Sequence, residues 1–177
     1  MSVLPIRTFG DPVLRDTARP VEDFDESLRR LADDMIQTMH QAPGVGLAAP
    51  QVGRSLRLIV FDVGDEADGA RALVNPVLRD EWGEQVGEEG CLSIPGLYYP
   101  VKRAMKVWAE GFDTTGLAVT LEAEELMARV LQHEVDHING VLFIDRLDEE
   151  HRSEAMAAIR DQALGLAPVD HDPTRAL

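Results

Sequence analysis

The segment His133-Glu134-Val135-Asp136-His137 constrains this chain more than any other feature. It lies between Glu124 and Ile138, a stretch without glycine or proline that is followed by Asn139-Gly140, and this pattern predicts a helix. Residues four apart lie on one face of a helix, so the two imidazoles can bind one metal ion. Glu134, about 100° around the helix from His133, can then reach a water on that ion. The segment therefore predicts a hydrolytic metal centre.

Two histidines leave such a centre incomplete, because catalytic zinc or iron usually takes three protein ligands. The position six residues after His137, which is a histidine in many metalloproteases, is Phe143. Glu154 is one candidate for the third ligand, and it would make the protein a general metallopeptidase. Cys91 is the other candidate, although a lone cysteine is often only a small buried apolar side chain. The histidine pair favours Cys91, and the residues alone leave both ligand sets open.

A third segment, Gly44-Val45-Gly46-Leu47-Ala48-Ala49-Pro50-Gln51, follows the first predicted helix. Glycines two apart let the backbone run close to a ligand or to another chain. An extended peptide could therefore add itself as a strand beside Gly44–Gly46. Gln51 offers an amide donor that could face a developing oxyanion.

Hydrophobic periodicity predicts the remaining elements. The pattern indicates an N-terminal amphipathic helix, two paired strands, a later hairpin and a C-terminal helix, over residues 25–40, 56–61 with 72–74, 105–110 with 117–121, and 149–164. The fold class is α+β, with small mixed or antiparallel sheets packed around a central metal-binding helix. We expect one catalytic domain over residues 1–165 and a flexible acidic tail over residues 166–177.

Composition excludes several classes of protein. A formal net charge of -15 over 177 residues argues against stable nucleic-acid binding over a broad basic face. The single cysteine cannot form an internal disulfide, which suits a reducing compartment. No stretch approaches the roughly 18 apolar residues of a membrane span, and the N-terminus does not look like a signal peptide. We therefore expect a cytoplasmic protein with no membrane contact.

Together the three segments resemble peptide deformylases, which carry G-x-G-L-A-A-x-Q, E-G-C-L-S and Q-H-E-x-D-H motifs in that order. Here these motifs stand at residues 44–51, 89–93 and 132–137. The resemblance extends to residues 73–76, 101–103 and 140–146. The interval between Gln51 and Glu89 has no insertion, as in the compact bacterial type of the family.

The resemblance implies an enzyme that removes the formyl group from N-formylmethionine of new polypeptides, giving formate and a free amino terminus. It implies that Cys91, His133 and His137 bind one divalent metal ion. That ion would be Fe(II) natively, with zinc, nickel or cobalt able to occupy the site. A protein of this fold without turnover, kept as a metal-dependent binding module, is a further alternative, but such a module would be expected to have lost Glu134 or Gln51.

The resemblance also assigns roles to other residues. Glu134 would be the catalytic base, the Gln51 side chain and the Leu92 backbone N–H would stabilise the oxyanion, and Glu89 with Arg103 would form an ion pair behind the site. The substrate would contact residues of the glycine segment and of the helix, with the aliphatic part of Arg129 at the mouth of the methionine pocket: Gly44, Val45, Gly46, Leu126, Arg129 and Val130.

A transient contact with the ribosome is the remaining implication. Family members of the compact type can use a basic C-terminal helix for this contact. From Asp148 onward this chain has seven acidic residues against Arg152, Arg160 and Arg175. That mode of docking is therefore not supported by the charges of this chain.

Overall fold

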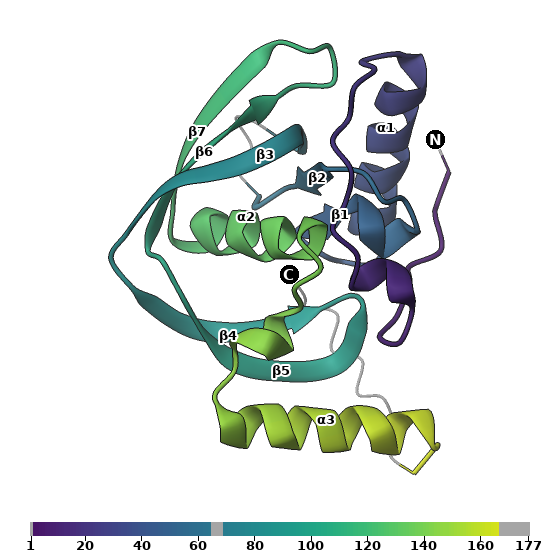
Figure 1. The fold of residues 1–177 in the computed structure, drawn as a ribbon, viewed down its shortest axis with the longest axis vertical. Helices are drawn as coiled ribbons and strands as arrows, with labels where there is room; N and C mark the ends of the chain where they lie inside the picture. Colours follow the sequence, from purple (N-terminus) through teal and green to yellow (C-terminus); the bar gives the residue numbers. More distant parts are fainter. Residues whose placement is uncertain (1, 65–68, 167–177) are drawn as a thin grey trace.

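Two antiparallel sheets and three α-helices form the framework of the protein (Figure 1). The computed structural model describes residues 2–64 and 69–166. One sheet has the strand order β1-β2-β3-β6-β7, and the other consists of β4 and β5. The strands are β1 (Gly46–Ala48), β2 (Leu58–Phe61), β3 (Arg71–Trp82), β4 (Gln85–Cys91), β5 (Ile94–Arg103), β6 (Lys106–Phe112) and β7 (Ala118–Glu124). The helices are α1 (Glu26–Gln41), α2 (Glu125–Ile138) and α3 (Glu149–Ala163), with short 3-10 helices η1 (Pro12–Leu14), η2 (Ala49–Val52) and η3 (Phe143–Arg146). The α+β prediction is confirmed.

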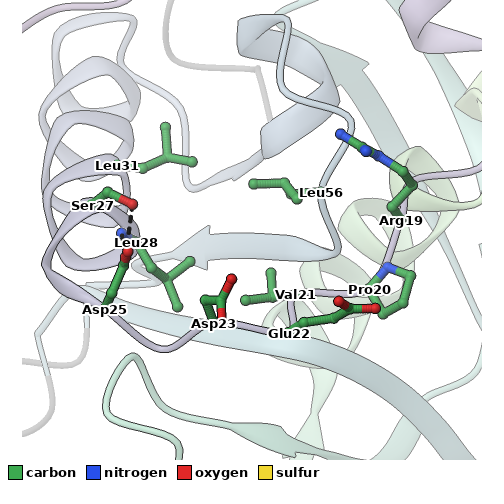
Figure 2. Close-up of a pocket in the computed structure, with 10 residues that line it drawn as sticks. All are labelled: Arg19, Pro20, Val21, Glu22, Asp23, Asp25, Ser27, Leu28, Leu31 and Leu56. Atoms are coloured by element: carbon green, nitrogen blue, oxygen red, sulfur yellow. Dashed lines mark hydrogen bonds between the residues drawn. The ribbon is translucent and has the colours of Figure 1, made fainter.

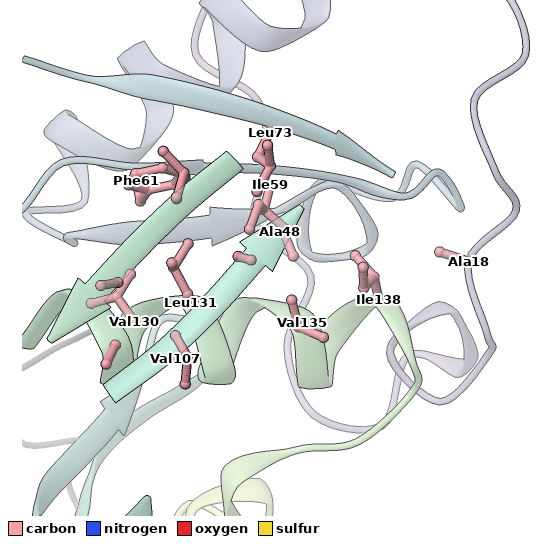
Figure 3. Packing of buried hydrophobic residues seen from close by; sticks show 14 residues of the cluster. Ala18, Ala48, Ile59, Phe61, Leu73, Val107, Val130, Leu131, Val135 and Ile138 are labelled. Carbon is pink, nitrogen blue, oxygen red and sulfur yellow. The ribbon is translucent and has the colours of Figure 1, made fainter. Parts of the chain in front are cut away.

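Helix α2 lies between the two sheets (Figure 1). Every residue from Ala128 to Ile138 is buried, so the helix has no solvent-facing side over most of its length. Its apolar side chains pack on the five-stranded sheet in a core that includes Ile59, Leu73, Val107, Val130, Leu131, Val135 and Ile138 (Figure 3). Buried polar groups must find partners inside the protein. The buried polar residues of α2 therefore mark the place where a functional site can lie.

The predicted N-terminal helix is present as α1. Asp25 caps it by accepting a 3.0 Å hydrogen bond from the backbone N–H of Leu28. The predicted apolar stripe is turned inward, because Leu28, Met35 and Met39 are buried in a core shared with β1 and β2. The helix thus covers the β1 end of the large sheet (Figure 1).

Two features of the sheets differ from the prediction. The strand expected to stop at Asn75-Pro76 continues as β3 to Trp82, through a register shift between Val74 and Val77. Proline has no backbone N–H and cannot donate a hydrogen bond to a neighbouring strand. A bulge accommodates it, because the pairing of the two strands is interrupted there. The β4–β5 sheet has no counterpart in the sequence prediction.

The C-terminal part is only partly described. Helix α3 packs on β5 and η3 through Ala155, which is buried, and Ile159, which is half-buried. The tail expected from residue 166 lies outside the described residues except for its first residue. Within residues 2–64 and 69–166, none of the helices combines the length and apolar composition that crossing a membrane requires.

Candidate metal centre

The structure brings Cys91, the last residue of β4, together with His133 and His137 of α2. One ligand atom from each residue lies within 4.8 Å of the other two, and all three residues are buried. Cys91 Sγ is 3.2 Å from His137 Nε2. Glu154, the alternative third ligand, is exposed on α3 and is not part of this cluster. Among the described residues, the thiol is therefore the group that completes the histidine pair.

Buried polar atoms without a hydrogen-bond partner concentrate at this cluster. Of the five such side-chain atoms in the described part of the chain, four belong to α2: His133 Nε2, both carboxylate oxygens of Glu134, and His137 Nδ1. Buried polar atoms are rarely left unpaired, so an unpaired imidazole nitrogen close to a buried thiol fits a position that binds a metal ion. One sulfur and two imidazole donors form a set that binds zinc, iron(II) or cobalt. The donor set therefore fits the divalent ion expected from the sequence.

Glu89 sets the orientation of one imidazole. Its Oε2 is 3.0 Å from His133 Nδ1, which leaves His133 Nε2 facing the cluster. Arg103 donates two hydrogen bonds to the same carboxylate, of 2.8 and 2.9 Å. Burial raises the pKa of Glu89, but the hydrogen bonds from Arg103 and His133 outweigh it and hold this pKa well below its usual range. The carboxylate therefore stays ionised behind the imidazole.

Arg129 lies elsewhere than the sequence suggested. It was expected at the mouth of a pocket, but it is only 4% exposed. Its Nη1 donates to Glu89 Oε1 at 2.8 Å and to the carbonyl oxygen of Val101 at 3.0 Å. The Glu89 carboxylate and the Val101 carbonyl oxygen thus give the guanidinium charged and polar partners in the interior. The mouth position for Arg129 is thus wrong, and the guanidinium belongs to the ion-pair network behind the cluster.

Glu134 is fully buried, and β1 closes over it. A Cβ atom added at Gly46 would lie 2.4 Å from Glu134 Oε1, so any larger residue would push this carboxylate out of its position. Burial raises the pKa of Glu134 to about 7, although the neighbouring charge of His133 opposes the shift. In the sheet formed by the described residues, β1 pairs with β2 alone, and no strand pairs with its other edge.

Gln51 lies on the other side of the cluster, in η2. Its Oε1 accepts a 2.7 Å hydrogen bond from the backbone N–H of Ala48, which fixes the orientation of the amide. Its Nε2 then lies 3.6 Å from Cys91 Sγ and 3.3 Å from Ser93 Oγ. Leu92 directly follows Cys91 and is half-buried. Both expected oxyanion donors are therefore next to the thiol.

The expected substrate residues occupy different depths. Val130 is buried, Val45 is half-buried, and Leu126 at the start of α2 is 47% exposed. A separate surface cavity of about 490 Å³ lies between α1 and the segment 19–23 (Figure 2). None of the residues that line this cavity belongs to the Cys91, His133 and His137 cluster.

Sequence reasoning missed the part played by Arg146. This residue of η3 binds Asp136 of α2 through two hydrogen bonds, of 3.0 and 2.5 Å. The sequence shows only an arginine after an aspartate in Asp145-Arg146. The contact arises because the chain turns back on α2 after Gly140, and no local pattern signals that return.

Comparison with known proteins identifies the family of this chain. The family model described as polypeptide deformylase matches residues 3–153. The peptide deformylase of Acidothermus cellulolyticus is 59% identical over 162 residues, which cover 91% of this chain and 88% of that protein. The peptide deformylase of Parafrankia sp. is 52% identical over 162 residues, covering 91% of this chain and 87% of that protein.

Solved structures show the same similarity in three dimensions. A peptide deformylase from Legionella pneumophila superposes with a TM-score of 0.86 at 43% identity, covering 94% of this chain and 100% of that one. The enzyme from Thermus thermophilus superposes with a TM-score of 0.85 at 47% identity, covering 93% of this chain and 97% of that one. The chain therefore belongs to the peptide deformylases, the enzymes that remove the formyl group from nascent polypeptides.

Proposed function

We propose that Cys91, His133 and His137 hold the one divalent metal ion with which this peptide deformylase hydrolyses N-formylmethionyl peptides. The observation that carries the proposal is the unpaired, buried His133 Nε2 in a cluster with the Cys91 thiol. Fe(II) is the proposed native ion, with zinc, nickel or cobalt able to replace it, since this donor set accepts all of them. When bound, such an ion supplies Lewis acidity that activates water and polarises a carbonyl.

Glu134 is the proposed general base. Its carboxylate is buried beside the cluster and makes no hydrogen bond within the described residues. A pKa raised to about 7 suits a group that must both accept and release a proton near neutral pH. In this proposal Glu134 takes a proton from the attacking water and later gives it to the leaving amine.

Gln51 and Leu92 are the proposed oxyanion donors. The Ala48 hydrogen bond holds the Gln51 carbonyl, so the NH₂ group is turned toward the thiol before any substrate arrives. A preorganised donor of this kind needs no reorientation during the reaction, and removing one typically costs about 10²- to 10³-fold in rate. The Leu92 backbone N–H follows the metal-binding sulfur directly in the chain.

Substrate is proposed to bind as an added strand along Gly44–Gly46, because no strand of the described sheet pairs with the second edge of β1 and Glu134 packs against Gly46. The methionine side chain would enter an apolar pocket near Val45, Leu126 and Val130, with Arg129 behind it. We further propose that residues 1–165 act as one catalytic domain in the cytoplasm. A ribosome contact would be transient and would not depend on a basic α3, since α3 has more acidic than basic residues.

Formate release from a formylmethionyl dipeptide tests the proposal. The metal-loaded protein should release formate, chelation should stop the release, and added metal should restore it. Glu134→Ala should retain metal and lose about 10²-fold or more in kcat. A metal-loaded protein that releases no formate would indicate a binding module without turnover. Full activity in Glu134→Ala would show that Glu134 is not the general base.

Two matched variants test the ligand set. Cys91→Ala should lose metal, whereas Glu154→Ala should keep both metal and activity, because Glu154 is exposed outside the cluster. The opposite pattern would restore the general metallopeptidase alternative. Metal analysis of protein prepared without oxygen distinguishes iron from zinc, since cysteine thiolates are prone to oxidation.

A further inference from the structure

We propose that Arg146 is a positioning residue for the metal centre. From η3 it holds Asp136, and this leaves Arg103 free to hold Glu89 against His133. The inference rests on the metal-binding role proposed above for His133. It assigns a role to a side chain that is separated from the imidazole by three residues, Asp136, Arg103 and Glu89.

Arg146 takes both oxygens of Asp136. Its Nε donates to Asp136 Oδ2 at 3.0 Å and its Nη2 donates to Oδ1 at 2.5 Å. Arg103 reaches the same carboxylate with a single donor, Nη1, at 2.6 Å from Oδ2. The two-point contact on Asp136 therefore belongs to Arg146.

Arg103 uses its other edge for Glu89. Its Nε and Nη2 donate to the two carboxylate oxygens, and Glu89 Oε2 contacts His133 Nδ1. The side chains of Arg103 and Glu89 are 3% and 0% exposed, whereas that of Arg146 is 48% exposed. A continuous series of ion pairs thus runs from the surface to the imidazole.

Two buried carboxylates share the Arg103 guanidinium. An arginine that donates two hydrogen bonds to a carboxylate binds it more strongly than one that donates a single bond. A guanidinium has only five N–H donors in a fixed geometry, so the two carboxylates compete for them. With Arg146 present, Asp136 is satisfied by a second cation, and Glu89 keeps the two-donor edge of Arg103. Without Arg146, Asp136 would draw Arg103 toward itself, because a buried carboxylate left short of partners is costly. Glu89 would keep the Arg129 hydrogen bond on Oε1, but the Arg103 hydrogen bond to Oε2, the oxygen that contacts His133, would weaken, and Glu89 would hold His133 less firmly.

The same short helix offers an internal control. Asp145 accepts a 2.9 Å hydrogen bond from the backbone N–H of Leu142 and forms an ion pair with Arg15. The Arg15 pair anchors η3 next to Arg146, and the described contacts of Arg15 do not include Asp136. Arg15→Ala therefore loosens η3 without breaking the series of ion pairs.

The test is the affinity for Zn²⁺ and Co²⁺, measured by competition with a chromophoric chelator. Direct partners of metal-binding histidines typically contribute 10- to 100-fold, so a more distant residue should contribute about tenfold. We expect Arg146→Ala to weaken metal affinity about tenfold, Arg146→Lys to recover part of it, and Arg15→Ala to stay within about twofold. An Arg146→Ala protein that binds as tightly as the wild type, or an equal loss in Arg15→Ala, would overturn the inference.

A double-mutant cycle with Asp136→Asn tests the route. If Arg146 acts through the Asp136 charge, adding Arg146→Ala to Asp136→Asn should cause no further loss of affinity. An equal loss in both backgrounds would show that Arg146 acts otherwise. If Arg146→Ala alone does not fold, Arg146→Lys takes its place in the cycle, because both single variants must be measured. If the wild type binds no metal, or Cys91→Ala binds as well as the wild type, the proposed function fails instead.

Discussion

Glycine and glutamate meet at the centre of the site, where β1 crosses α2. Gly44 and Gly46 are both in the motif that the sequence analysis assigned to close backbone approach, but their surroundings differ. A Cβ at Gly46 would collide with the buried Glu134 carboxylate, whereas a Cβ at Gly44 would lie 2.8 Å from Leu92 Cδ1. Leu92 Cδ1 is the far end of a flexible side chain, which can move. Of the two glycines, only Gly46 therefore packs directly against the proposed base.

We predict that Gly46→Ala lowers kcat about 10²-fold or more while the protein stays folded, because the added methyl group displaces Glu134 from its position near the attacking water. Gly44→Ala is the comparison variant: Gly44 lies in the proposed substrate strand and away from Glu134, so its methyl group should act mainly on KM and change kcat only a few-fold. Steady-state kinetics of formate release, with circular dichroism to check folding, would measure both. Near-normal turnover in Gly46→Ala would show that the carboxylate tolerates displacement.

Strand β3 is held to the N-terminal segment by Asn75, which adopts a left-handed conformation with φ of 51°. Its Oδ1 accepts from the backbone N–H of Val21 at 2.8 Å, and its Nδ2 donates to the carbonyl oxygen of Val21 at 2.9 Å. Asparagine tolerates this conformation better than most residues. Strand β3 therefore has a bulge that accommodates Pro76. It is also joined by two hydrogen bonds to Val21, which is far away in the sequence.

Replacing Asn75 by alanine should lower the free energy of unfolding by about 2–3 kcal/mol, from two lost hydrogen bonds and the left-handed backbone. Asn75→Gly also loses the hydrogen bonds but adopts this conformation without strain, so we expect a smaller loss of about 1–2 kcal/mol. Urea unfolding of the three proteins would give both values. Equal losses in the two variants would mean that the backbone conformation contributes nothing.

At the scale of the whole molecule, the cluster joins the two sheets. Cys91 comes from β4 of the small sheet, while His133 and His137 come from the helix that packs on the large sheet. A ligand that binds only the folded state stabilises it in proportion to the logarithm of its concentration relative to Kd. The metal is therefore expected to link the layers as well as to serve the reaction.

Withdrawal of the metal should lower the free energy of unfolding. With free metal at about 100 times Kd, the expected difference between loaded and chelated protein is about 2.7 kcal/mol. Thermal or urea unfolding, with and without added Zn²⁺, would measure it. Cys91→Ser should lose this metal-dependent increment, and an unchanged increment in that variant would place the stabilising metal elsewhere.

Local features of the structure were predictable from local sequence. The extents of α1 and α2 follow from periodicity and helix-end signals, because helical hydrogen bonds join residues four apart. The facing of His133 and His137 follows from the same geometry. The three motifs were enough to identify the family. The structure brings residues from all three of them together around the cluster.

Other features required the tertiary structure. Spacing left Cys91 and Glu154 as rival ligands, and only the packing of β4 against α2 brought the thiol within reach of a histidine 46 residues later. The β4–β5 sheet, the inward turn of Arg129 and the return of Arg146 to Asp136 are also contacts between segments far apart in the chain. Such contacts depend on which buried charges and strand edges come together when the layers pack. A pattern of neighbouring residues does not specify them, because it describes only local geometry.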